Sequence, residues 1–174
     1  IKKIRKVFNK DEYRRVFLIH PLQFSEELVN VSIARNMRYY AYPPYGLGLL
    51  CTNLKDRGYI VDILDLNMEM LDFIMNGGIE DEEVVKARIV TLWKEKLKQR
   101  MIDFQPDVVG LTCTFTMAHE MTLKVADFIK EHEMGLPIVA GGVHITNAPE
   151  IVLKEGKSVD FVSLYEADQS FCEF

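Results

Sequence analysis

Five short apolar segments, separated by longer segments with helical spacing, constrain the fold of this chain more than any other feature. They lie at residues 16–19, 60–64, 108–112, 138–140 and 161–164. Most are nearly continuous apolar runs, which is typical of strands covered by helices on both faces. Their alternation with helical segments indicates repeated βαβ units around a parallel sheet. The sequence therefore predicts a doubly wound α/β fold with a five-stranded parallel sheet.

The segments between the strands carry the signals of helices. The predicted helices are one around 47–54 that ends at Gly58, a long one over 81–104, one around 117–129, a short one that Asn147 caps and Gly156 ends, and a last one that Asp168 would cap. The connection 67–81 passes through Asn76, Gly77 and Gly78, and we interpret it as a helix-breaking turn.

The connection between the first strand and the first helix is about twenty residues long, against a usual handful in such units. It contains Arg35 and several tyrosines, among them Tyr39, Tyr40 and Tyr42. One interpretation is a surface excursion or an extra helix. The other is a lid over a ligand at the edge of the sheet.

Composition narrows the class of protein. The 174 residues suffice for a single well-packed domain, and a net charge of −5 with interspersed signs argues against binding to nucleic acid or to an anionic membrane. No apolar run reaches the length of a membrane span, and the basic start lacks the apolar stretch of a signal peptide. Three scattered cysteines, Cys51, Cys113 and Cys172, fit a reducing compartment. We therefore expect a cytoplasmic protein.

Candidate ligand contacts lie after the strands, because open parallel sheets bind ligands at the carboxyl ends of their strands. Gly141 and Gly142 follow the fourth strand. Two residues without Cβ allow a flat or bulky ligand to approach the backbone, whereas a tight turn alone explains one glycine. The hydroxyls of Thr112, Thr114 and Thr116 can donate hydrogen bonds to a polar ligand, although Thr116 serves equally well as a helix N-cap.

Each titratable residue at a strand end has a structural and a functional interpretation. His20 and His144 are ligand or acid-base candidates, but two isolated histidines make no metal-binding spacing, which favours structural imidazoles. His119 and His132 fall on a helix and are interpreted as surface or packing residues. The carboxylates Asp65 and Glu166 are either ligand contacts or solvated strand ends, with Glu166 the stronger candidate.

Ordered blocks of residues resemble one protein family over roughly residues 14–174. They are PPYGLGLL at 43–50; Leu54, Gly58, Val61 and Asp65; PDVVGLT at 106–112 with Phe115 and Thr116; PIVAGGVHITNAPE at 137–150; and DFV at 160–162 with Phe171. Together they resemble the N-terminal cobalamin-binding domain of cobalamin-dependent radical S-adenosylmethionine (radical SAM) enzymes, many of which are methyltransferases.

The resemblance implies a flavodoxin-like strand order of 2-1-3-4-5, with residues 1–174 forming one cobalamin-binding domain and 1–13 an N-terminal extension. It implies that the corrin lies over the carboxyl edge and that its nucleotide tail enters near strands one, three and four. The expected contacts are Thr112, Thr114, Phe115, Thr116, Gly141, Gly142, Val143 and His144, together with Glu166. No catalytic residue and no protein ligand to a metal is predicted.

Two motifs of such proteins differ here. The family usually carries Gly-Glu-Gly-Glu after strand five, where this chain has Tyr165, Glu166, Ala167 and Asp168. Other cobalamin carriers have a DxHxxG loop after strand one, whose histidine binds cobalt; the segment that begins with His20 lacks it. The resemblance therefore implies base-off cobalamin with no histidine ligand from that loop.

The chain carries no CxxxCxxC motif for a [4Fe-4S] cluster. In the family, a radical SAM domain that binds the cluster and S-adenosylmethionine follows the cobalamin domain. We therefore expect this chain to be a fragment of a methyltransferase-like enzyme whose C-terminal radical SAM domain is its partner in the same polypeptide. The alternative is a noncatalytic corrinoid-binding or sensor module that acts through a separate partner.

Overall fold

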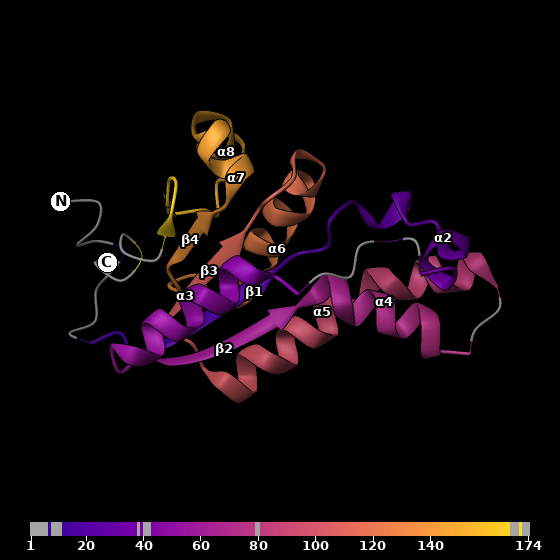
Figure 1. Cartoon of the computed structure of the whole chain (residues 1–174), viewed down its shortest axis with the longest axis horizontal. Coiled ribbons are helices and arrows are strands. Elements are labelled where there is room, and N and C mark those ends of the chain that lie inside the picture. The colour runs from indigo at the N-terminus through magenta and orange to yellow at the C-terminus, as the bar shows by residue number, and fades with distance from the viewer. Residues whose placement is uncertain are drawn as a thin grey trace.

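A computed structural model of the chain has the five-stranded parallel sheet that the sequence predicts (Figure 1). It describes residues 7, 12–37, 39, 43–78, 81–167 and 171. The strands are β1 (Arg15–His20), β2 (Ile60–Asp65), β3 (Val108–Thr112), β4 (Ile138–Gly141) and β5 (Phe161–Val162). Their order is β2-β1-β3-β4-β5, and every neighbouring pair is parallel. The doubly wound, flavodoxin-like fold is confirmed.

Helices cover both faces of the sheet (Figure 1). Val16 and Leu18 of β1 point to one face, where they join the buried residues of α3; Phe17 and Ile19 point to the other and join those of α4, α5 and α6. The helices are α2 (Val31–Arg35), α3 (Tyr45–Asp56), α4 (Leu66–Asn76), α5 (Glu82–Phe104), α6 (His119–His132), α7 (Val143–Asn147) and α8 (Pro149–Glu155). This two-sided cover explains the continuous apolar strands.

The interpretation of residues 67–81 as a turn is wrong over most of that segment, because α4 begins directly after β2. The carboxylate of Asp65 accepts a hydrogen bond from the N–H of Met68 at 3.1 Å and caps the helix. Gly77 then ends it, with its N–H donating to the carbonyl of Phe73 at 2.8 Å. A cap that is itself the last residue of a strand leaves no loop between the two elements. The sequence pattern therefore showed the end of α4 but not its start.

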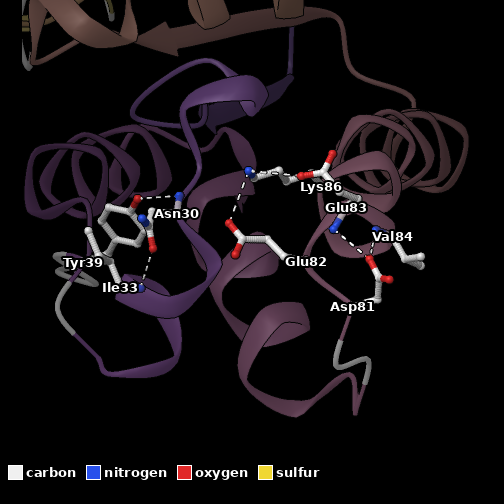
Figure 2. Close-up of polar contacts among 8 residues, drawn as sticks. All are labelled: Asn30, Ile33, Tyr39, Asp81, Glu82, Glu83, Val84 and Lys86. Atoms are coloured by element: carbon white, nitrogen blue, oxygen red, sulfur yellow. Dashed lines mark hydrogen bonds and ion pairs between the residues drawn. The ribbon is translucent and has the colours of Figure 1, made fainter.

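The long connection after β1 holds an extra helix, as one of its two interpretations states. It contains the short 3-10 helix η1 (Glu26–Leu28) and α2 (Val31–Arg35), which contacts α4 and α5. Figure 2 shows Asn30 capping α2: its side chain accepts from the N–H of Ile33 at 2.9 Å, while its own N–H donates to the Tyr39 hydroxyl at 2.8 Å. Residues 38 and 40–42 lie outside the described part, so the lid interpretation of Tyr40 and Tyr42 stays a prediction.

The helix α5 has the predicted extent, and its start is explained by capping and charge. Figure 2 shows the Asp81 carboxylate accepting from the N–H groups of Glu83 and Val84 at 2.9 and 3.1 Å. Lys86 pairs with Glu82 at 3.2 Å one turn further on. Acidic residues in the first turn also interact favourably with the helix dipole.

Three predicted boundaries differ from the structure. Asn147 is the last residue of α7, and Ala148 precedes α8, so Asn147 does not cap that helix. Thr116 begins a short 3-10 turn (Thr116–Ala118) instead of capping α6, which lacks a side-chain cap. The strand β5 ends at Val162, two residues early, and the chain then turns at Tyr165, which has a φ of 61°.

The expected cap at Asp168, the cysteine at 172 and most of the extension 1–13 lie outside the described residues. Within the described part, none of the helices combines the length and the apolar character that crossing a membrane requires.

Candidate functional site

A groove opens at the carboxyl edge of the sheet, on the face that α3 covers. It lies over β3 and β4, beside the point between β1 and β3 where the strand order reverses. Ligands of open α/β sheets bind at such points. Its volume is about 510 Å³, and it is lined by Leu18, Gly46, Leu47, Leu49, Leu50, Asn53, Gly110, Leu111, Thr112, Val139, Gly141, Gly142, Ser163, Tyr165, Glu166, Ala167 and Phe171.

The groove reaches down to the backbone of the sheet because β3 carries a glycine, Gly110, at its centre. A Cβ on Gly110 would come within 2.8 Å of the Leu18 side chain and 3.3 Å of the Phe171 ring. Phe171 itself is buried at the groove wall. The absence of a side chain at Gly110 therefore lets the apolar walls of the groove approach the sheet.

The two glycines after β4 have different reasons to be glycine. A Cβ on Gly142 would lie 2.6 Å from the carbonyl oxygen of Cys113, and its φ of 109° suits glycine alone. A Cβ on Gly141 would make only ordinary contacts, 3.6 Å from the Ser163 carbonyl oxygen. Gly142 is therefore required by the close approach of two backbones, while Gly141 adds open space at the groove.

The other predicted contacts divide between the groove and the rim above it. Thr112, Gly141, Gly142 and Glu166 line the groove. Thr114, Phe115, Thr116 and Val143 are exposed beside its mouth, and 51% of Phe115 and 59% of Val143 is accessible to solvent. His144 is buried, and the groove does not reach it. Whether each of these residues contacts a ligand stays a prediction.

Tyr165 takes the backbone conformation of a glycine. Its φ is 61°, its N–H donates to the Thr146 hydroxyl at 2.9 Å, and its side chain is 81% exposed. A left-handed conformation is costly for a residue with a Cβ. Tyr165 therefore holds a conformation that glycine favours, and it adds an aromatic ring at the groove.

Replacing Tyr165 with glycine is expected to raise the free energy of unfolding by about 0.5–1 kcal/mol, because glycine adopts this φ without strain. Urea denaturation measures the change. The matched variant Tyr165→Ala removes the same ring but keeps the Cβ, so it should show no such gain. An equal gain in both variants would contradict a backbone origin.

His20 and Asp65 form a pair at the ends of β1 and β2, where their Cα positions are in register. His20 Nδ1 lies 3.0 Å from Asp65 Oδ1, and the imidazole is buried. The other carboxylate oxygen, Oδ2, is buried and has no hydrogen-bond partner. His20 is thus hydrogen-bonded, as a structural imidazole would be, and Asp65 is a helix cap instead of a solvated strand end.

His144 is also hydrogen-bonded, and its partner is a residue that sequence reasoning assigned to surface or packing. His144 Nε2 lies 2.9 Å from His119 Nδ1, and His119 Nε2 lies 3.0 Å from a carboxylate oxygen of Glu155. Burial, and secondarily the neighbouring His119, lower the pKa of His144. These three residues are far apart in the sequence, so no spacing rule could have grouped them.

Metal-binding and nucleophilic chemistry have little support in this region. Among the described residues, no three His, Cys, Asp or Glu side chains are grouped so that they could hold a metal ion. Cys113 is buried, and its burial raises the pKa of the thiol. A protonated, inaccessible thiol is a poor nucleophile.

A protein-family model for the B12 binding domain matches residues 31–174, which is most of the chain. This chain belongs to the B12-binding domain family. Over 70 residues it is also 33% identical to an uncharacterized methyltransferase of Pyrococcus horikoshii. That alignment covers 40% of this chain and 15% of the Pyrococcus protein. The match therefore spans only a small part of that relative.

The residues of the groove fit a large cofactor such as B12 (cobalamin). The walls are mainly aliphatic and aromatic, with polar groups from Asn53, Thr112, Ser163, Tyr165 and Glu166. The volume falls in the range of pockets that enclose one drug-sized group. The groove could hold the nucleotide end of cobalamin, whereas the exposed Phe115 and Val143 leave an apolar surface for the flat corrin.

Proposed function

We propose that this domain binds cobalamin with the nucleotide tail in the groove and the corrin on the carboxyl edge of the sheet. The single observation that carries this proposal is the groove of about 510 Å³ over β3 and β4, beside the switch point between β1 and β3, within a chain of the B12-binding family. Thr112, Gly141, Gly142 and Glu166 would face the tail; Thr114, Phe115, Thr116 and Val143 would contact the corrin, with His144 behind them.

The proposed cofactor is base-off, without a histidine ligand from the segment after β1. Two observations support this proposal. His20, the histidine at that strand end, is buried. The segment that begins with His20 also lacks the DxHxxG loop of other cobalamin carriers.

We further propose that the domain serves a cobalamin-dependent radical SAM enzyme, and that the cobalamin when bound would supply methyl transfer or related radical chemistry. The likeness to the Pyrococcus methyltransferase supports the methyl-transfer part. The chain's own residues would orient the corrin and limit access to it. A [4Fe-4S] cluster and S-adenosylmethionine would belong to a C-terminal domain of the same polypeptide, in a cytoplasmic protein.

Cobalamin binding can be tested at two glycines of α3. A Cβ at Gly46 or at Gly48 would meet nothing within 4 Å, but only Gly46 lines the groove. Gly46→Phe should fill the groove and weaken the Kd for hydroxocobalamin at least about tenfold, a change of about 1.4 kcal/mol. Gly48→Phe adds the same ring to the same helix and should bind like the unmodified chain.

Corrin absorbance retained after desalting, followed by equilibrium dialysis, measures both variants. A folded, unmodified chain that retains no hydroxocobalamin would overturn the binding proposal. An equal loss of affinity in the two phenylalanine variants would instead indicate that the nucleotide tail does not lie in the groove. For the radical SAM assignment, the decisive observation is a CxxxCxxC motif within about a hundred residues downstream in the gene; its absence would favour the noncatalytic module.

A further inference from the structure

Three titratable side chains from three helices form one hydrogen-bonded chain near the groove that is proposed for the cofactor. They are His144 of α7, His119 at the start of α6 and Glu155 at the end of α8. The distances are 2.9 Å between the imidazoles and 3.0 Å from His119 to the carboxylate, and the rings meet edge to face with centroids 5.0 Å apart. We call this group the histidine clamp.

The number of protons in the clamp follows from its geometry. An ionised Glu155 only accepts, so His119 Nε2 carries a hydrogen and donates it. In a neutral His119 the Nδ1 atom is then an acceptor, and His144 Nε2 must donate to it. If one proton is added, the two imidazoles can share it, provided that His144 changes its tautomer. A second added proton would leave an N–H group on each imidazole, facing each other across 2.9 Å. The hydrogen bond between the imidazoles would then break.

The clamp connects the loop after β3, which carries the exposed Phe115, with the loop after β4, which carries the exposed Val143. His119 follows the loop of Phe115, and His144 follows Val143 directly. The backbone N–H of His144 also donates to the carbonyl oxygen of Cys113 at 3.1 Å, close to Gly142. A change in the contact between the imidazoles would therefore change the spacing of Phe115 and Val143 across the mouth of the groove.

The elements packed against the imidazole pair carry several charged groups, including Glu150 and Lys154 of α8 besides Glu155. Glu155 faces it from α8, and the protonated thiol of Cys113 lies at the end of β3 next to the His144 backbone. The helix α7 has no other titratable side chain. On α6, the adjacent Glu120 is directed to Lys124 and Ser25. Histidine is the side-chain type whose charge changes in mild acid, so the contact between the imidazoles is the part of this group that a change of pH would affect.

We propose that the histidine clamp positions the two cofactor-binding loops and opens when both imidazoles are protonated, so that corrinoid affinity falls in mild acid. This inference rests on the proposed function. His119, His144 and Glu155 are positioning residues in it. The lowered pKa of His144 keeps that ring neutral until the pH falls below its ordinary value of 6.5. The clamp is therefore closed at neutral pH.

The test is the Kd for cyanocobalamin from pH 5 to 8, because the upper ligand of this corrinoid does not titrate there. The unmodified chain should show a constant Kd above pH 7 and a rise of about fivefold toward pH 5, the effect of one lost side-chain hydrogen bond. His119→Gln, which removes the titrating partner, should bind more weakly at pH 7.5 and lose most of this pH dependence. His132→Gln, an exposed histidine at the other end of α6, should follow the unmodified chain.

Amide hydrogen exchange of the cofactor-free chain gives an independent measurement. After correction for the intrinsic pH dependence, residues 113–119 and 142–148 should exchange faster in His119→Gln at pH 7.5, as they do in the unmodified chain at pH 5.5. Unchanged exchange, or the same pH profile in His119→Gln and the unmodified chain, would overturn the clamp. If the chain binds no corrinoid at any pH, the proposed function fails, and the exchange data still decide whether the clamp exists.

Discussion

Replacing Gly142 with alanine is expected to lower the free energy of unfolding by about 3 kcal/mol. The backbone of Gly142 has a φ of 109° and a ψ of 173°, a region that costs a residue with a Cβ about 1–3 kcal/mol. The new Cβ would also lie 2.6 Å from the Cys113 carbonyl oxygen and 2.9 Å from its carbonyl carbon, so the two backbones must separate. That separation would weaken the hydrogen bond from the His144 N–H to the same oxygen.

The neighbouring glycine is the matched control for this prediction. Gly141→Ala places its Cβ in ordinary contact with Ser163, at 3.6 Å or more. Its effect on stability should therefore stay within about 0.5 kcal/mol. Urea denaturation measures both variants, and similar losses at the two positions would contradict the assignment of the backbone contact to Gly142 alone. Because Gly142→Ala disturbs folding, the groove itself is better tested at Gly46.

Replacing Glu26 with alanine is expected to cost about 3 kcal/mol of stability. The Glu26 side chain is buried; one carboxylate oxygen accepts from the Trp93 indole N–H at 2.8 Å and the other from Lys124 at 3.1 Å. Hydrogen bonds to charged groups are worth about 1.5–3 kcal/mol each, and the lysine is partly exposed, so its share lies at the lower end. The variant would also leave the buried indole N–H without its acceptor.

Glu120 provides the comparison, because it pairs with the same Lys124 from the surface. That ion pair measures 2.8 Å, but the Glu120 side chain is 59% exposed. Glu120→Ala removes this exposed pair and the acceptor of the Ser25 hydroxyl, so it should cost about 1–2 kcal/mol, less than Glu26→Ala. Thermal or urea denaturation separates the two cases. Equal losses would show that the burial of Glu26 contributes nothing to its effect.

Glu26 also illustrates what the sequence could not resolve in the long connection after β1. A glutamate in a polar loop is normally solvated, and no local pattern predicts that it is buried. Its partners Trp93 and Lys124 come from α5 and α6, 67 and 98 residues away. Only the packing of these helices on the sheet brings the three together. This contact anchors η1 to α5 and α6.

The sequence by itself determined the class of fold, because continuous apolar strands alternating with amphipathic helices leave few other ways to bury the apolar residues. It also placed the candidate site at the strand ends, since every parallel strand ends at the same edge. The start of α4 was missed because Asp65 serves both as strand end and as helix cap. The glycine pair was recognised, but the different roles of Gly141 and Gly142 depend on a contact with Cys113.

The tertiary structure alone decided which side chains meet. His119, His144 and Glu155 lie on three separate helices, and their hydrogen bonds exist because α6, α7 and α8 converge at one corner of the sheet. Likewise, Gly46 of α3 and Gly110 of β3 line the same groove only after α3 packs on the sheet. Periodicity records which face of an element is buried, but it carries no information on which elements that face meets.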